Sequence, residues 1–238
     1  MDLKNGIIRV NKTDVDFYTQ VVKETFVKIV DVIDKKAIGD LEIFLGHLKV
    51  TENYNAYKIM KGDSAIGYKN LYLLPLEFNT VGFFFTFPHS IEDELWSKRS
   101  RDKDILEMLI KRKNVDIRKE VFGGALHGIE HAMIGIMPFH VMCDRWDIGG
   151  LSTNFHPATG KATVFIYDGF DGGIGLSEKA YELFGEIIKT TLELVKECSC
   201  DEGCPACIYS PKCGNDNKPM DKKASIFLLD KIKNSYIC

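Results

Sequence analysis

Five cysteines fall within sixteen residues of this chain, and no other sequence feature restricts its fold as strongly. They follow the pattern C-x-C-x3-C-x2-C-x5-C, at Cys198, Cys200, Cys204, Cys207 and Cys213. The C-x-x-C pair at 204 and 207 lets two thiolates reach one ion from a single tight turn. In a reducing compartment such clustering favours a bound metal over disulfide bonds. We therefore expect a loop that a metal ion organises.

Zinc bound by four thiolates is the interpretation that suits this spacing best. Tetrahedral zinc takes four ligands, so five cysteines compete for four places. Cys204 and Cys207 are the safest pair, Cys200 comes next, and the fourth ligand is either Cys198 or Cys213. An iron–sulfur cluster and unliganded thiols are the alternatives. Because four thiolates leave no position for a water, we expect a structural role and assign no catalytic residue.

Composition and charge narrow the class of protein. The chain has 238 residues, of which 45% are hydrophobic and 27% charged, with a net charge of −3. This excludes a globally basic nucleic-acid coat protein and leaves room for a local basic groove. The longest apolar run, at 81–87, is far shorter than the roughly 20 residues that span a bilayer. The first twelve residues lack the apolar core of a signal peptide. We expect a soluble, cytoplasmic protein with no membrane partner.

The hydrophobic pattern predicts an α+β fold. Residues 14–35 repeat apolar side chains at helical spacing and predict an amphipathic helix. Residues 40–88 contain short aromatic and β-branched runs, which predict about four antiparallel strands that end at Pro88. Further strands are expected near 151–155 and 162–167, and helices at 117–142, at 177–197 and after Asp221. The antiparallel, β-rich N-terminal half would pack with a helical, zinc-stabilised C-terminal half.

These elements suggest a domain organisation. We expect an N-terminal helix at 1–38, a β-rich segment at 39–90 and a helical, zinc-binding domain at 91–238. The last two would form one compact unit. The helix at 117–142 is rich in glycine, and each interior glycine costs about 0.5–1 kcal/mol relative to alanine. Such a helix is expected only where it is buried and other backbones pass close to it.

A second constellation lies on that glycine-rich helix. His127, Glu130 and His131 match H-x-x-E-H, the inverted zinc-peptidase motif. On a helix the two imidazoles would lie one turn apart, with the glutamate beside them as a general base. A zinc-dependent hydrolase is therefore the alternative function. Polar side chains that hydrogen-bond inside a buried helix are the more common explanation of so short a pattern.

Two further segments could contact nucleic-acid phosphates. The run Asp168–Gly175 follows a predicted strand and opens a helix, so its backbone amides could hold a phosphate. A tight strand-to-helix turn is the simpler explanation. Nine lysines and arginines between residues 98 and 119 alternate with acidic residues, which is typical of a solvated surface or of a phosphate-contacting patch. The phosphate-contact candidates are Gly172, Gly173, Gly175, Arg99, Arg101 and Arg112.

The order of the motifs resembles a known family. The segments are HGIEHAMIGIMPFHVMCDRWDIGG, TVFIYDGFDGGIGLSEKAYE, CSCDEGCPACIYSPKCGN and PMDKKAS, preceded by GHLKVTENYNAYKIM and LPLEFNTVGFFFTFP. Together they resemble the zinc-binding C-terminal domain of helicases of the mitomycin-repair-factor-A (MrfA) type, over roughly residues 40–232. The family consists of superfamily 2 DNA helicases that have two RecA-like motor domains and are implicated in DNA repair.

The resemblance carries expectations of its own. It implies zinc ligands at Cys200, Cys204 and Cys207, with Cys198 or Cys213 as the fourth. It also implies an accessory DNA-handling role, with single-stranded or junction DNA and helicase motor domains as partners. The sequence has no G-x-x-x-x-G-K-[ST] motif and no DEAD-type box, so we expect no ATP hydrolysis by these residues alone. The motor would lie in cis, if the chain is part of a helicase, or in trans.

Overall fold

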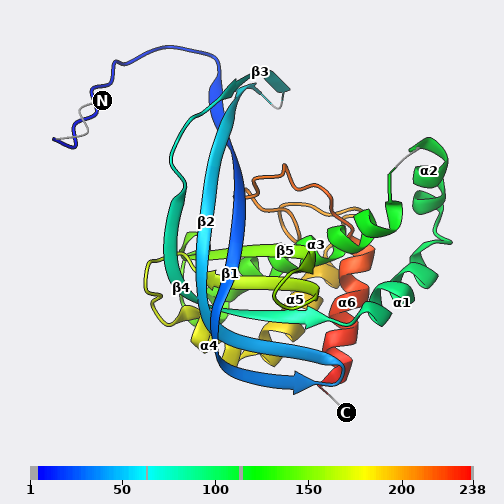
Figure 1. The fold of residues 1–238 in the computed structure, drawn as a ribbon. Coiled ribbons are helices and arrows are strands. Elements are labelled where there is room, and N and C mark those ends of the chain that lie inside the picture. The colour runs from blue at the N-terminus through cyan, green and yellow to red at the C-terminus, as the bar shows by residue number, and fades with distance from the viewer. Residues whose placement is uncertain (1–4, 63, 113–114, 237–238) are drawn as a thin grey trace. The chain divides into compact units, whose positions relative to one another are not determined.

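The computed structural model describes residues 5–62, 64–112 and 115–236, which form two compact units. The first unit comprises the residues up to Glu24 together with Asn53–Leu74, and the second comprises Thr25–Glu52 and the chain from Pro75 onward. Two long strands, β1 (Tyr18–Ile38) and β2 (Leu41–Lys61), contribute residues to both units (Figure 1). The chain therefore passes from one unit to the other three times, at 24/25, 52/53 and 74/75.

The first unit contains an antiparallel ladder between the end of β2 and β3 (Ser64–Asn70). The register pairs Ala56 with Asn70, and a bulge interrupts the ladder next to Met60. Lys61 forms an ion pair with Asp16 at 2.5 Å. Only Ala56 and Met60 are buried here among the described hydrophobic residues, so this unit has almost no apolar core of its own.

The predicted N-terminal helix is wrong. Residues 18–38 form strand β1, which lies next to β2 in the sheet. Val21, Val22, Ile29, Val30 and Ile33 are β-branched, and such side chains fit a pleated strand better than a helix. Pairing with β2 then decides between a strand and a helix, because so dense an apolar pattern fits both the two-residue period of a strand and the 3.6-residue period of a helix. Residues 1–4 of the proposed helical segment lie outside the described residues.

The second unit is built on an antiparallel sheet, as the sequence predicted. In it β2 pairs with β4 (Leu76–Phe87), β4 with β6 (Lys161–Asp168), and β6 with β5 (Ile148–His156). Alternation along β4 sends Phe83 and Phe85 into the large core and Phe84 to the opposite face. There the ring of Phe84 stacks on Phe44 with 4.9 Å between centroids. Each face of the sheet therefore carries a cluster of buried apolar side chains.

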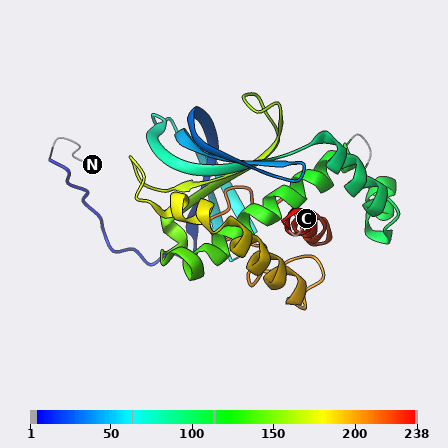
Figure 2. The same cartoon turned by 90° about the horizontal axis from the view of Figure 1, so that it is seen from below.

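Helices cover one face of this sheet, and Figure 2 shows α3, α5 and α6 gathered on one side of its strands. The predicted helix at 117–142 is confirmed as α3. The predicted helix at 177–197 is interrupted at Leu183 and forms α4 and α5. The helices are α1 (His89–Arg99), α2 (Lys103–Lys111), α3 (Ile117–Val141), α4 (Leu176–Glu182), α5 (Phe184–Glu197) and α6 (Lys222–Ser235), with a 3-10 turn η1 at Arg145–Asp147. Within the described chain, no helix is both long and apolar enough to cross a bilayer.

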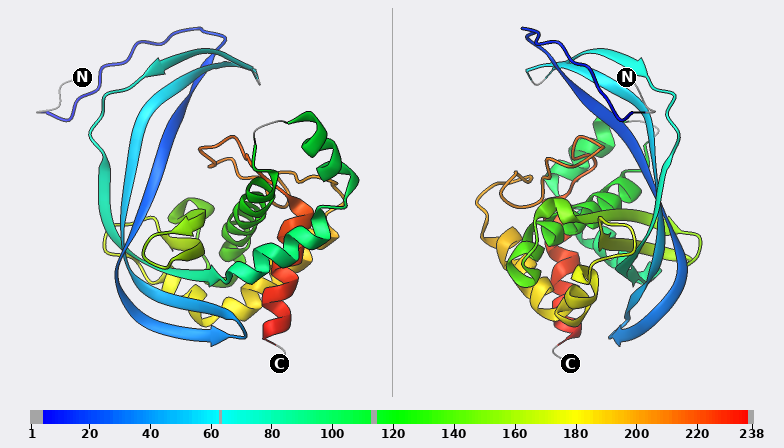
Figure 3. Two further views of the ribbon diagram at one scale, coloured as in Figure 1. Left: turned by 45° about the vertical axis from the view of Figure 1, so that its right-hand side comes forward. Right: turned by 90° about the vertical axis from the view of Figure 1, so that its left-hand side faces the viewer.

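The glycines of α3 explain how this helix is packed. It lies against α5, α6 and β5, and its middle is buried (Figure 3). A Cβ at Gly124 would come within 2.9 Å of the backbone carbonyl carbon of Met220. A Cβ at Gly128 would collide with the hydroxyl oxygen of Ser225. The prediction that other backbones pass close to this helix is therefore confirmed.

Candidate metal centre

Four of the five clustered cysteines bring their sulfur atoms together. They lie in residues 198–221, which join α5 to α6 and, all being described, contain no helix or strand. Cys198 directly follows α5 as its C-cap residue, and its Sγ lies 3.6 Å from that of Cys200 and 3.5 Å from that of Cys204. The Sγ of Cys207 lies 3.5 Å from that of Cys200 and 3.8 Å from that of Cys204. The four sulfurs thus form one small cluster.

The spacing of these sulfurs suits a single tetrahedral ion. Thiolates that bind zinc at about 2.3 Å along tetrahedral directions lie about 3.8 Å from one another. All four sulfurs lie within 4.8 Å of one another, and the distances given above cluster near the tetrahedral value. An iron–sulfur cluster would divide its cysteines among different iron atoms and spread the sulfurs further apart. The donor set and its geometry therefore fit one zinc ion.

Local backbone bonds shape the site before any ion binds. The amide of Cys207 donates to the carbonyl of Cys204 at 3.0 Å, and the amide of Tyr209 donates to the same oxygen at 3.1 Å. These bonds close the tight turn of the C-x-x-C pair. The backbone amide of Cys200 lowers the pKa of the Cys198 thiol to about 7. Burial raises the pKa of the Cys207 thiol. The environment thus acts in opposite directions on the thiols of Cys198 and Cys207.

Lys222, which the sequence reasoning missed, supports this cluster from α6. Its Nζ donates to the backbone carbonyls of Cys198 and Cys200, each at 2.6 Å, and lies 3.4 Å from the Sγ of Cys200. Lys222 is only 6% exposed. A buried ammonium beside four thiolates offsets part of their negative charge. The sequence contained one signal of this role. A lysine in the first turn of a helix interacts unfavourably with the helix dipole, so its presence there indicates a compensating contact.

Cys213 does not join the four-cysteine cluster. Its Sγ lies 3.4 Å from the Nε2 of His127, and the ring centroids of His127 and His131 are 4.3 Å apart. One ligating atom from each of these three residues falls within 4.8 Å of the others. The structure therefore separates the five cysteines into a group of four and a single cysteine that faces two histidines.

Both histidines are held by backbone carbonyls. The Nδ1 of His127 lies 3.0 Å from the carbonyl oxygen of Pro219, and the Nδ1 of His131 lies 2.9 Å from that of Ile208. Burial lowers the pKa of His127. Burial, together with the neighbouring His127, lowers the pKa of His131 to about 3. Both imidazoles are thus neutral near pH 7.

Glu130, the third residue of the H-x-x-E-H pattern, is not part of the His127–His131–Cys213 group. Its carboxyl hydrogen-bonds with Ser152 on β5, and a Cβ at Gly150 would touch it. Burial raises the pKa of this carboxyl to about 7. One position along a helix turns a side chain by about 100°, and that rotation directs Glu130 toward the sheet.

The amides of Gly172 and Gly173 and three further amides of this turn are engaged by acceptors within the protein. The amide of Gly172 donates to the carbonyl of Asn79, and the amide of Gly173 donates to that of Phe170. The buried carboxylate of Asp168 accepts from four groups, which are the amides of Ile174, Leu176 and Ser177 and the hydroxyl of Ser177. An internal anion thus takes the place that a phosphate would need. We therefore leave Gly172, Gly173 and Gly175 out of the proposed function.

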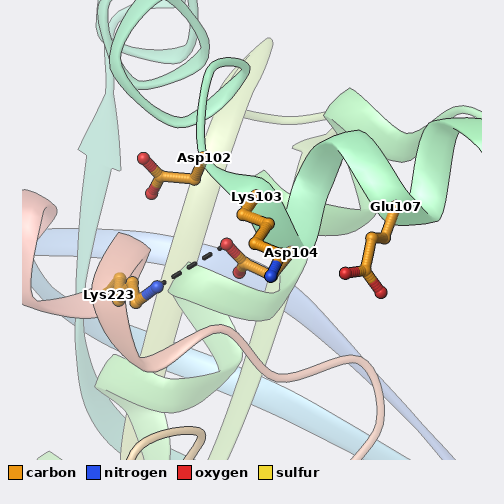
Figure 4. Close-up of a pocket in the computed structure, with 5 residues that line it drawn as sticks. All are labelled: Asp102, Lys103, Asp104, Glu107 and Lys223. Carbon is orange, nitrogen blue, oxygen red and sulfur yellow. Dashed lines mark ion pairs between the residues drawn. The ribbon is translucent and has the colours of Figure 1, made fainter.

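Arg99 is buried rather than presented to solvent. Its guanidinium donates to the carboxylates of Asp102, of Asp104 at 2.7 Å and of Asp221 at 2.8 Å, and its side chain is 6% exposed. Two of these partners, Asp102 and Asp104, line the pocket in Figure 4, where Lys223 pairs with Asp104 at 3.5 Å. The ion pair between Arg99 and Asp221 links α1 to the start of α6. We therefore do not propose Arg99 as a phosphate contact.

The other two predicted cations lie near the surface. Arg101 is exposed and, among the described residues, makes no ion pair. Arg112 donates to Glu120 at 2.5 Å, while 45% of its side chain remains exposed. Lys111, Arg118 and Lys119 of the predicted basic stretch are also paired with acidic side chains. Of the three predicted phosphate-contacting arginines, Arg101 and Arg112 are the two that remain accessible to an external phosphate.

Comparisons with known proteins agree on one family. The model of the family described as "MrfA Zn-binding domain" matches residues 129–208, which include the four clustered cysteines. An uncharacterized protein of Methanocaldococcus jannaschii, MJ1572.1, is 44% identical over 110 residues, which are 45% of this chain and 98% of that protein. The uncharacterized ATP-dependent helicase YprA of Bacillus subtilis is 28% identical over 207 residues, which are 87% of this chain and 25% of the helicase.

A solved structure shares the fold. The crystal structure of the DUF1998 helicase MrfA bound to DNA superposes with a TM-score of 0.61 at 25% identity, over 93% of this chain and 26% of that one. The chain thus spans about a quarter of the length of the helicases it matches. The cysteine cluster and the matched model together identify zinc as its metal. The chain belongs to the family of proteins that contain the MrfA zinc-binding domain.

Proposed function

We propose that this chain is an accessory, DNA-handling domain that acts with an ATP-dependent superfamily 2 helicase motor in DNA repair in the cytoplasm. The observation that carries the proposal is the likeness, over 93% of the chain, to a helicase whose structure contains DNA. The helicase relatives supply the link to a motor. We assign ATP hydrolysis to that motor, on the same polypeptide or on another one.

Zinc has a structural role in this proposal. We assign Cys198, Cys200, Cys204 and Cys207 as its ligands, because their sulfurs form the tetrahedral cluster and Cys213 lies elsewhere. Four thiolates leave no coordination position for a reacting water. The ion would hold the irregular residues 198–221 in one conformation. That conformation would fix how α6 packs on α3 and α5.

Arg101 and Arg112 are the proposed DNA contacts. Arg101 is exposed, and Arg112 would exchange its contact with Glu120 for a phosphate. At a net charge of −3 the chain as a whole does not attract DNA, so contacts must be local. We therefore expect weak, salt-sensitive binding to single-stranded or junction DNA, with the motor supplying most of the affinity.

Fluorescence anisotropy with labelled single-stranded, junction and duplex oligonucleotides tests this proposal at several salt concentrations. Each phosphate contact contributes about 0.7 to the salt slope on a single strand, so Arg101→Glu and Arg112→Glu should each lower it by about that amount. Lys196→Glu is the matched control, because Lys196 lies on α5 and pairs with Asp230. If the affinity for DNA changes neither with salt concentration nor on substitution of the two arginines, the assignment of Arg101 and Arg112 as DNA contacts is overturned.

The hydrolase alternative receives no support from the site. A general base must lie within hydrogen-bond reach of the water it activates. The carboxyl of Glu130 is held by Ser152 and does not belong to the group formed by the two histidines and Cys213. We therefore propose no hydrolytic function for this motif.

A further inference from the structure

We propose that His127, His131 and Cys213 form a second metal site, which binds a divalent cation of the borderline-soft class to which zinc belongs. Two imidazoles and one thiolate are a donor set that such cations prefer. The three ligating atoms lie within 4.8 Å of one another, and His127 Nε2 is 3.4 Å from Cys213 Sγ. A nitrogen and a sulfur that share a tetrahedral zinc lie about 3.6 Å apart.

The orientation of the histidines prepares them to bind an ion. Each Nδ1 faces a backbone carbonyl, of Pro219 for His127 and of Ile208 for His131, and therefore carries the proton. This tautomer leaves the lone pair on each Nε2. Histidines that bind metals commonly donate their other ring N–H to a backbone carbonyl in this manner, which fixes the ring and its tautomer. Both histidines have this arrangement, one helical turn apart on α3, so both Nε2 atoms are available to the same ion.

Backbone amides stabilise the thiolate. The amides of Asn215 and Asn217 lie 3.4 Å and 3.3 Å from the Sγ of Cys213 and donate to it. The side chain of Asn217 in turn accepts from the amide of Ser210 at 2.7 Å, which closes the turn around the cysteine. The two amide donors favour the charged form of the sulfur, whereas burial favours the neutral thiol. A cation that coordinates the sulfur would deprotonate it.

The second site differs from the four-cysteine cluster in what it can do. It has three protein ligands, so a fourth position is left for a water or an external ligand. It also goes beyond the matched family model, because His127 and Cys213 both lie outside residues 129–208. The two sites are linked through the backbone. Ile208, whose carbonyl holds His131, directly follows the zinc ligand Cys207. The cysteine loop therefore helps to position the second site.

Metal stoichiometry tests the proposal directly. The full chain is equilibrated with zinc chloride and then freed of loosely bound ions. Inductively coupled plasma mass spectrometry should then find about two zinc ions per chain, one for each ligand group. Cys213→Ser and His127→Gln should each lower that value to about one ion. His127→Gln keeps a polar side chain of similar length. Cys143→Ser and His47→Ala are the controls, because neither residue belongs to a ligand group among the described residues.

Cobalt substitution separates the two sites. Cobalt(II) bound by thiolates shows a sulfur-to-metal charge-transfer band, and five thiolates would contribute to it when both sites are filled. Cys213→Ser should remove about one fifth of the band, while the four-cysteine spectrum remains and shows that the variant is folded. A wild-type chain that holds only one zinc ion would overturn the second site, as would a Cys213→Ser spectrum equal to that of the wild type. Neither result touches the proposed DNA function, which the anisotropy experiment tests.

Discussion

The Nζ of Lys222 lies 3.4 Å from the Sγ of Cys200 and donates to the carbonyl oxygen of the same residue at 2.6 Å. This contact joins the first turn of α6 to the cysteine cluster. The lysine is buried, so its charge acts on the thiolates without the screening that water provides at a surface. Electrostatic support of this kind belongs to the metal site as much as the ligands do.

Lys222→Met should weaken zinc binding by about 10–100-fold, the usual effect of losing an outer-shell partner of a metal ligand. The measurement is competition for zinc against a chromophoric chelator. Lys223→Met is the matched control, because Lys223 is the next residue, is 57% exposed and pairs with Asp104 instead. If both variants release zinc at the same chelator concentration, Lys222 does not support the site.

Cys204→Ser should remove zinc and loosen residues 198–221, because a structural zinc ion contributes its binding free energy to folding. Hydrogen exchange followed by mass spectrometry would report faster exchange in this segment, and treatment of the wild type with a chelator should reproduce it. Cys143→Ser should leave both metal content and exchange unchanged, since Cys143 lies outside the cluster. Full metal occupancy in Cys204→Ser would contradict the assignment.

Arg99→Met should destabilise the second unit by about 3 kcal/mol, because breaking a buried ion-pair network leaves charges without partners. In this case the carboxylates of Asp102, Asp104 and Asp221 would face one another without their shared cation. Urea denaturation measures the difference. Arg101→Met, an exposed neighbour, should change stability by no more than about 0.5 kcal/mol. Equal effects of the two substitutions would show that the network contributes nothing.

Asp104 should make stability depend on acid pH. Burial raises the pKa of its carboxyl, but the hydrogen bond and the charge of Arg99 lower it further, so the folded pKa lies below the usual value. A depressed folded pKa contributes stability above the unfolded pKa of about 3.9, and that contribution is lost as pH falls through the folded pKa.

Asp104→Asn should therefore be less stable than the wild type at pH 6, and the difference should shrink below about pH 4. Thermal melts of both proteins across this range would show it. Glu107→Gln is the control, because Glu107 lies on the same helix and, among the described residues, forms an ion pair only with the exposed Lys111. A difference between Asp104→Asn and the wild type that stays constant with pH would contradict the linkage.

Much of the second unit could be predicted from the sequence because its patterns are local. The aromatic run that became β4 could not fit a helix without exposing phenylalanines, and Pro88 marked its end. The glycines of α3 required close neighbours, and Met220 and Ser225 are those neighbours. The strand at 18–38 was predicted as a helix because its apolar residues fit the spacing of a helix as well as that of a strand. Only pairing with β2 distinguishes the two.

The metal centre was predictable only in part, because some of its contacts are local in the sequence and others join distant residues. Four cysteines within ten residues can meet on one ion without help from the rest of the fold. The choice between Cys198 and Cys213 depends on α3, because Cys213 faces His127, 86 residues earlier in the chain. The direction of Glu130 depends on Ser152 in β5. No local pattern encodes contacts of that kind.

The close approach of α3 to residues that come about a hundred positions later has a consequence during synthesis. Ser225 donates to the carbonyl of Ala125, and Pro219 accepts from His127. A ribosome that adds roughly 5–20 residues per second needs roughly 5–20 s to make the segment that covers this helix. For that interval the nascent chain holds a 25-residue, glycine-rich apolar helix without its cover. The newly made chain is therefore most prone to aggregate before its cysteine loop exists, and metal uptake comes late in its folding.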